Sequence, residues 1–193
     1  MSTFQLLSSP TVAALPVTSA PAEQFWYAIY TRARHEKSVA SLLHQKAVTV
    51  FLPVLAQSHH WSDRRKVVEV PLFAGYAFVR VGASAQAHLQ VLQIPGVVGF
   101  VGNGRSGVPI PDKQIEDIKT VLGHRVPCAI FPFLRVGQLV RIRGGCLDGI
   151  EGRLTTLKGD RTLVISIEPI LQSLAIRLDG YDVEILESDD SMA

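Results

Sequence analysis

Three aromatic residues lie within six positions near the middle of the chain: Phe73, Tyr76 and Phe78. They belong to the stretch VVEVPLFAGYAFVRV, residues 67–81, whose two ends alternate in the manner of β-strands. Rings at the start of a strand either fill a core or form a rigid contact surface. Gly75 lies among them, where unusual dihedrals or a close backbone approach are permitted. The stretch predicts a strand with one core face and leaves the task of the other face open.

No spacing in the chain indicates catalysis. His59 and His60 are adjacent, so they cannot both face one metal from a strand, and no cysteine or carboxylate cluster has ligand spacing. Gly102-x-Gly104 lacks the remainder of a phosphate-binding fingerprint. The two cysteines, Cys128 and Cys146, are expected to be reduced and structural. The sequence therefore predicts no enzyme, no cofactor and no metal site.

Charge is distributed unevenly along the chain. The net charge is only +2, yet residues 25–105 hold nine basic and three acidic residues. This excess indicates either an acidic partner such as nucleic acid or a solvated basic face. Residues 1–24 have three prolines and no lysine or arginine, so they predict a disordered tail and not a signal peptide. No apolar run reaches the ~18 residues needed to span a bilayer, and we expect a cytoplasmic protein without a membrane partner.

The first domain is expected over residues 25–123. Its patterns predict strand, helix, three strands, helix, strand and helix, in that order. The helices are expected at 34–46, at 84–93 with Leu89 and Leu92 inward, and from 111 or 112 onward. A strand over 48–55 is interrupted at Pro53, and 57–70 indicates a hairpin with a charged tip. The prediction is an α+β domain, an antiparallel sheet with helices on one face.

The second half of the chain differs in its sequence pattern, with short apolar stretches separated by glycines. Residues 124–134 hold two prolines and no clear period, which indicates a linker. Five short strands are expected between 135 and 187, at 138–143, 150–157, 162–167, 173–178 and 182–186. Such short, glycine-punctuated strands predict a small five-stranded β-barrel. Residues 188–193 form an acidic tail.

Three stretches of the first domain together resemble the NusG family of transcription elongation factors. They are WYAIYT at 26–31 followed by the helix with Glu36 and Lys37, PLFAGYAFV at 71–79, and PGVVGFVG at 95–102 followed by VPI at 108–110. The stretch VGQLVRI at 136–142 resembles the family's KOW motif. The resemblance covers roughly 25–187 and implies an NGN domain followed by a KOW-type barrel. Pro71-Leu72-Phe73 is more similar to the operon-directed RfaH and UpxY-type antiterminators than to the housekeeping factor.

The resemblance implies that the first domain binds RNA polymerase, at the clamp of its largest subunit, through an apolar pocket on the sheet. His88 matches a position that reaches the other pincer of the polymerase. Periodicity alone makes the rings ordinary core residues, whereas the resemblance favours contact for Tyr30, Phe73 and Tyr76 above all. The full set of matching positions is Trp26, Tyr30, Phe73, Tyr76, Phe78 and His88.

Two basic groups match positions that face nucleic acid in the family. Arg32, Arg34 and His35 follow the first strand, where the resemblance implies contact with non-template DNA in the transcription bubble. Guanidinium groups suit this task because they pair with phosphates and stack on bases. A second group, Arg64-Arg65-Lys66 on the hairpin tip, is a candidate for upstream DNA. Both groups remain open to the simpler interpretation of a solvated surface.

The barrel of the family recruits a small-subunit ribosomal protein or the termination factor Rho. The corresponding loop here is 168–173, in which Ile170 and Leu171 are either exposed anchors or barrel core. We expect a non-enzymatic factor that binds RNA polymerase, bridges the clamp and promotes processive, antiterminated transcription. The alternatives are a housekeeping NusG acting with Rho in termination, and a KOW-type module that binds RNA or the ribosome.

Overall fold

The computed structural model describes residues 23–61, 64–102, 107–132, 137–157 and 159–186. Residues 1–22 of the tail expected at 1–24, the tail expected at 188–193, and Ser62 and Asp63 of the expected hairpin tip lie outside these ranges, and Gln24 already belongs to the first strand. In chain order the strands and α-helices are β1 Gln24–Thr31, α1 Glu36–Gln45, β2 Thr49–Phe51, β3 Val54–Trp61, β4 Arg64–Pro71, β5 Tyr76–Gly82, α2 Ala85–Leu92, β6 Val97–Phe100, β7 Pro109–Ile110, α3 Asp112–Gly123, β8 Cys128–Pro132, β9 Gln138–Arg143, β10 Glu151–Leu157, β11 Asp160–Ile167, β12 Gln172–Arg177 and β13 Asp182–Ile185.

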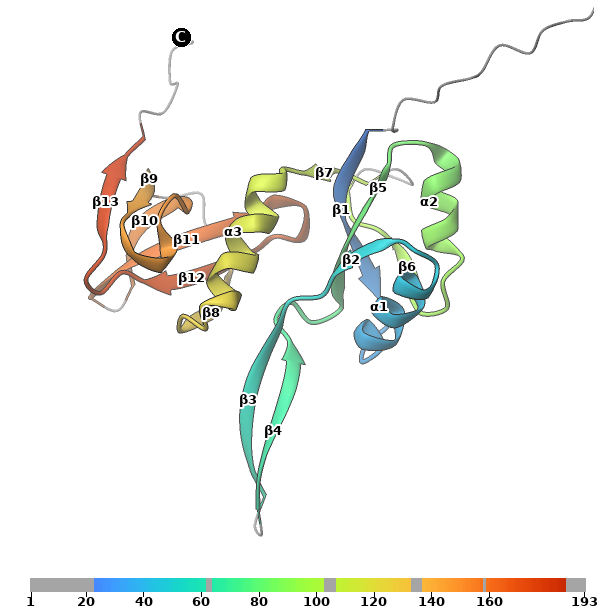
Figure 1. Cartoon of the computed structure of the whole chain (residues 1–193), viewed down its shortest axis with the longest axis horizontal. Coiled ribbons are helices and arrows are strands. Elements are labelled where there is room, and N and C mark those ends of the chain that lie inside the picture. Colours follow the sequence, from blue (N-terminus) through green and yellow to red (C-terminus); the bar gives the residue numbers. More distant parts are fainter. Residues whose placement is uncertain (1–22, 62–63, 103–106, 133–136, 158, 187–193) are drawn as a thin grey trace, which may run out of the picture.

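The N-terminal sheet is antiparallel, with strand order β2-β5-β1-β6 and with β7 also paired to β1. Its central strand β1 is buried on both faces. Tyr27 and Ile29 pack with α1 and α2 residues such as Val39 and Val91. Trp26 and its alternating neighbours face the opposite side of the sheet. The strands β3 and β4 form a separate two-stranded ribbon, which extends away from the body of the molecule (Figure 1).

Helix α3 covers the second face of this sheet, so the expectation of helices on one face only is wrong for this element. The apolar stripe of α3, with Ile115, Ile118 and Val121, lies in the same buried cluster as Trp26 and Phe78. The first face is already covered by α1 and α2. An amphipathic helix must bury its stripe somewhere, and α3 does so on the open face.

The C-terminal sheet has strand order β13-β9-β10-β11-β12-β8. All five strands expected in this half are present, as β9 to β13. The sixth strand, β8, lies inside the segment expected to be a linker. It pairs antiparallel with β12, and Ile130 stands opposite Leu174. A five-residue strand beside two prolines has too few positions to show a period, and its partner lies more than forty residues away, so local patterning could not reveal it.

One buried apolar cluster runs through both halves of the chain. It joins Trp26 and Phe78 of the first sheet, Ile118 of α3, and Leu163 and Ile176 of the C-terminal sheet. Figure 1 shows α3 between the two sheets. The two halves therefore share a core and pack against each other through α3. None of the helices in the described ranges has the length and apolar character needed to cross a membrane.

Candidate functional site

The aromatic residues singled out in the sequence fall into a buried and an exposed set. Trp26, Phe73 and Phe78 are fully or almost fully buried, and the rings of Phe73 and Phe78 meet edge to face at 5.9 Å. The ammonium group of Lys119 on α3 lies 4.9 Å from the Trp26 ring centroid. In this conformation a partner cannot touch these three rings directly, because α3 and the rest of the core surround them. They can support a contact surface beside them on the same face of the sheet.

Tyr30 and Tyr76 form the set that reaches the surface, with Tyr30 exposed and Tyr76 half-buried. They stand opposite each other on β1 and β5, with ring centroids 5.4 Å apart, and Tyr30 is 48% exposed. On its other side Tyr30 faces Gly99 of β6, where an added Cβ atom would meet nothing within 4 Å. One flank of the Tyr30 ring is therefore open. We call Tyr30, Tyr76 and Gly99 the tyrosine platform.

The turn before Tyr76 is held from two neighbouring elements. Gly75 has a φ of +81°, which favours glycine, and its N–H donates to Glu36 Oε1 of α1 at 2.8 Å. The N–H of Thr31 at the end of β1 donates to the carbonyl of Gly75, also at 2.8 Å. The turn is thus held at both the N–H and the carbonyl of Gly75.

The basic residues after β1 form an exposed turn that leads into α1. Arg32, Arg34 and His35 are all exposed, and Arg34 has a φ of 64°. The N–H of Arg32 donates to the carbonyl of Gly96 at 2.8 Å, which ties this turn to the start of β6. Among the described residues, neither arginine has an acidic partner within ion-pair distance. We call Arg32, Arg34 and His35 the basic turn; it begins two residues after Tyr30.

The second basic group opens strand β4. The backbones of Arg64 and Arg65 pair with those of Trp61 and His60, and Lys66 pairs with His59. These positions lie at the far end of the ribbon, remote from the tyrosine platform (Figure 1). The structure therefore separates the two basic groups that the sequence proposed as nucleic-acid contacts.

His88 does not lie on the surface as the sequence analysis required. It is buried on the inner side of α2, with ring centroids 4.9 Å from Tyr27 and 4.5 Å from Phe100. Leu89, which was expected to point inward, is exposed instead. The helix turns His88 and Val91 toward the sheet, because residues three apart share a face. Burial lowers the pKa of His88, and its Nε2 atom has no hydrogen-bond partner among the described residues.

The two candidate anchors of the barrel loop separate. Ile170 is buried in the barrel core, whereas Leu171 is 66% exposed and has a φ of 51°. The left-handed conformation of Leu171 ends a short 3-10 turn at Glu168–Ile170 and directs the chain into β12. Leu171 alone can serve as an apolar anchor.

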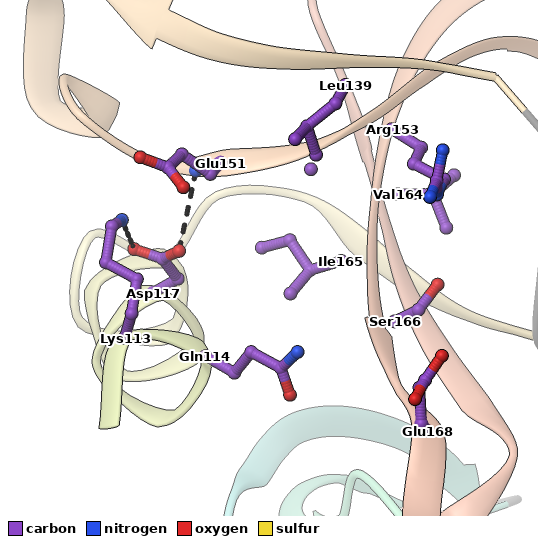
Figure 2. Close-up of a pocket in the computed structure, with 11 residues that line it drawn as sticks. Lys113, Gln114, Asp117, Leu139, Glu151, Arg153, Val164, Ile165, Ser166 and Glu168 are labelled. Carbon is purple, nitrogen blue, oxygen red and sulfur yellow. Dashed lines mark hydrogen bonds and ion pairs between the residues drawn. The ribbon is translucent and has the colours of Figure 1, made fainter. Parts of the chain in front are cut away.

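A cleft of about 390 Å³ between α3 and the C-terminal sheet was not foreseen. Figure 2 shows Lys113 and Asp117 of α3 beside Glu151 at one side of this cleft, with Val164 and Ser166 on the other side. Lys113 Nζ donates to Asp117 Oδ1 at 2.6 Å and to the carbonyl of Gly149 at 2.8 Å, and the N–H of Glu151 donates to Asp117 Oδ2 at 3.4 Å. Burial raises the pKa of Asp117, and the hydrogen bond from Lys113 opposes that rise. The i, i+4 spacing of Lys113 and Asp117 was visible in the sequence, but their contacts with the barrel were not.

Comparisons with known proteins give a consistent result. A family model described as "Transcription termination factor nusG" matches residues 24–119. The chain is 29% identical over 178 residues to a transcription termination/antitermination protein NusG from Lactococcus lactis, covering 86% of this chain and 95% of that protein. A protein of the same name from Borreliella burgdorferi is 22% identical, covering 82% and 97%. A solved structure titled "Domain interaction in Thermotoga maritima NusG" is 20% identical, covers 86% of this chain and 94% of that chain, and has a TM-score of 0.47.

Proposed function

We propose that this chain, which is similar to NusG proteins, is a transcription factor that binds RNA polymerase through the tyrosine platform and promotes processive, antiterminated transcription. The observation that carries the proposal is the pair of exposed Tyr30 and half-buried Tyr76, with an open flank at Gly99. Tyrosine is enriched among residues that dominate protein interfaces, since it combines a large apolar ring with a hydroxyl that tolerates water.

The buried rings contribute to the proposed site indirectly. Phe78 lies two residues after Tyr76 on the same face of β5, and Tyr76 is packed against the core cluster that contains Phe73 and Phe78. A rigid support lowers the entropic cost of binding, because the two tyrosines need not be ordered when the partner arrives. The clamp of the largest subunit is the polymerase surface that we propose for this contact.

The basic turn extends the proposed interface toward nucleic acid. Arg32 and Arg34 are exposed and directly follow the strand that carries Tyr30. Guanidinium groups at this place suit the phosphates and splayed bases of the non-template strand. A factor that holds both polymerase and bubble DNA favours the closed clamp if it binds that state more tightly than the open state.

Gly99 offers a test that leaves the core untouched. Gly99→Glu places a long charged side chain on the open flank of Tyr30, and Gly99→Ala is the matched control because a methyl group there meets no neighbour. We expect Gly99→Glu and Tyr30→Ala each to weaken binding to purified bacterial core RNA polymerase by about 2 kcal/mol, roughly thirtyfold. Gly99→Ala should bind nearly as the parent protein does. Unchanged binding by folded Gly99→Glu and Tyr30→Ala would reject the platform as the contact.

The direction of the transcriptional effect needs a separate assay. In vitro elongation through a terminator, with and without the protein, should show more read-through when it is present. Increased termination only in the presence of Rho would instead assign the housekeeping role.

A further inference from the structure

Glu36 is a buried acid without a basic partner in the described part of the chain. It is 6% exposed, and its carboxylate accepts the N–H of Gly75, a residue 39 positions away. A buried carboxylate is costly unless it is hydrogen-bonded. Its place in the first turn of α1 favours the negative charge, since the exposed N–H groups of a helix start carry partial positive charge. This contact joins α1 to the β4–β5 turn.

Gly75, which donates its N–H to Glu36, lies next to both tyrosines of the platform. Gly75 precedes Tyr76, and a Cβ atom at Gly75 would lie 3.4 Å from Cε2 of Tyr30. Glu36 holds the N–H of Gly75 and Thr31 holds its carbonyl, each at 2.8 Å. The backbone of Gly75, next to both tyrosines, is thereby held at its N–H and at its carbonyl.

The other side of Glu36 is the basic turn. Glu36 directly follows His35, and Arg34 and Arg32 lie two and four residues before it. The same carboxylate therefore connects the segment that bears the arginines to the turn that bears Tyr76. The backbone bonds from Thr31 to Gly75 and from Arg32 to Gly96 also tie this segment to the sheet, and Glu36 adds a side-chain hydrogen bond to them.

We propose that Glu36 is a positioning residue that holds the tyrosine platform and the basic turn in one fixed relation, so that polymerase and bubble DNA are bound together. The inference rests on the proposed function. It assigns Glu36 no direct contact with either partner. Its action passes through the Gly75 N–H, and the hydrogen-bond acceptor matters more than the charge.

Three variants separate these contributions. Glu36→Ala removes the acceptor, and Glu36→Gln keeps an amide oxygen that can accept the Gly75 N–H while removing the charge. Glu69→Ala is the matched control: it also removes one negative charge, but Glu69 is exposed and pairs only at the surface with Lys37. Circular dichroism and thermal unfolding report whether each variant is folded.

The readouts are Gly75 amide exchange and two affinities, one for core polymerase and one for an elongation complex with an open bubble. We expect Glu36→Ala to accelerate exchange at Gly75, to weaken polymerase binding about tenfold, and to lose most of the extra affinity that bubble DNA gives the parent protein. Glu36→Gln should restore all three properties, and Glu69→Ala should leave them unchanged.

Two outcomes would overturn the inference. One is faster exchange at Gly75 in Glu36→Ala with both affinities unchanged. The other is a Glu36→Gln variant that behaves like Glu36→Ala, which would make the charge decisive. If Glu36→Ala does not fold, Glu36→Asp, which retracts the acceptor by one methylene, must show intermediate losses for the inference to stand. Failure of the platform itself is detected separately, since Tyr30→Ala leaves the Glu36–Gly75 bond in place.

Discussion

His88 is held between the rings of Tyr27 and Phe100 with one ring nitrogen unpartnered, so its charge state bears on the stability of the fold. Burial lowers its pKa, which means that the folded chain resists protonation more than the unfolded chain does. Above the ordinary histidine pKa both states are neutral at this position. As the pH falls below about 6.5, the unfolded state binds the proton first and gains free energy.

Replacing His88 should therefore remove part of the acid sensitivity of the protein. His88→Phe keeps a ring between Tyr27 and Phe100 and abolishes the titration. We expect urea midpoints of the parent protein to fall between pH 7.5 and pH 5 by more than those of His88→Phe. Leu89→Phe adds a ring at the exposed neighbouring position. Its urea midpoint should fall with pH as much as that of the parent protein. If the urea midpoints of the parent protein and His88→Phe fell equally with pH, the titration of His88 would not contribute to the acid sensitivity of the fold.

At the same scale, the residue types of the candidate site were predictable and their exposure was not. The sequence placed Trp26, Tyr30, Phe73 and Tyr76 in one aromatic group, but only the register of β1 and β5 shows which rings face solvent. Glu36 appeared in the sequence only as part of a motif. Its bond to Gly75 joins residues 39 positions apart, and no local pattern encodes such a contact.

Among the elements, α3 has the largest influence on the architecture because it is buried from two sides. Ile115, Ile118 and Val121 are fully buried in the cluster that reaches both sheets. The sequence predicted this helix and its apolar stripe correctly. It could not predict the face of the sheet that α3 covers, because α1, α2 and α3 present similar stripes and only tertiary packing assigns them.

Truncating α3 in its centre should destabilise the whole chain. Ile118→Ala leaves a cavity where α3 meets the shared core, and we expect a loss of about 2–5 kcal/mol in the free energy of unfolding. Ile185→Ala on β13 removes the same atoms from a side chain that is 57% exposed and should cost much less. Urea denaturation of both variants measures the difference. A similar cost at the two positions would contradict the assignment of α3 to the core.

Strand β8 is the one element of the C-terminal sheet that the sequence pattern did not predict. The five barrel strands carry alternation and glycine turns, and all five were found near their expected places. Residues 128–132 have neither signal between Pro127 and the start of β9. Pairing with β12 makes them a strand, and that pairing is a property of the assembled sheet.

At the scale of the whole molecule, the two halves are joined by polar as well as apolar contacts. Lys113 reaches Gly149, and Asp117 accepts the N–H of Glu151, on the border of the shared cluster. Domains that share a core unfold together, whereas domains joined only by a flexible segment unfold separately.

The parent protein should accordingly unfold in one cooperative transition. Differential scanning calorimetry should give a single peak whose calorimetric and van't Hoff enthalpies agree. Ile118→Ala should move that whole peak to lower temperature. Two resolved peaks, with only one displaced by Ile118→Ala, would show that the halves are independent.

The pairing of β8 with β12 also limits how far the barrel can travel. Because β8 begins at Cys128, only residues 124–127 connect α3 to the C-terminal sheet. This linker spans at most about 14 Å when extended. If β8 left the sheet, the connection would run from 124 to 137 and could span about 50 Å. The length of the connection between α3 and the C-terminal sheet is therefore set by a single edge strand, whereas the shared core and the contacts of α3 hold the two halves together.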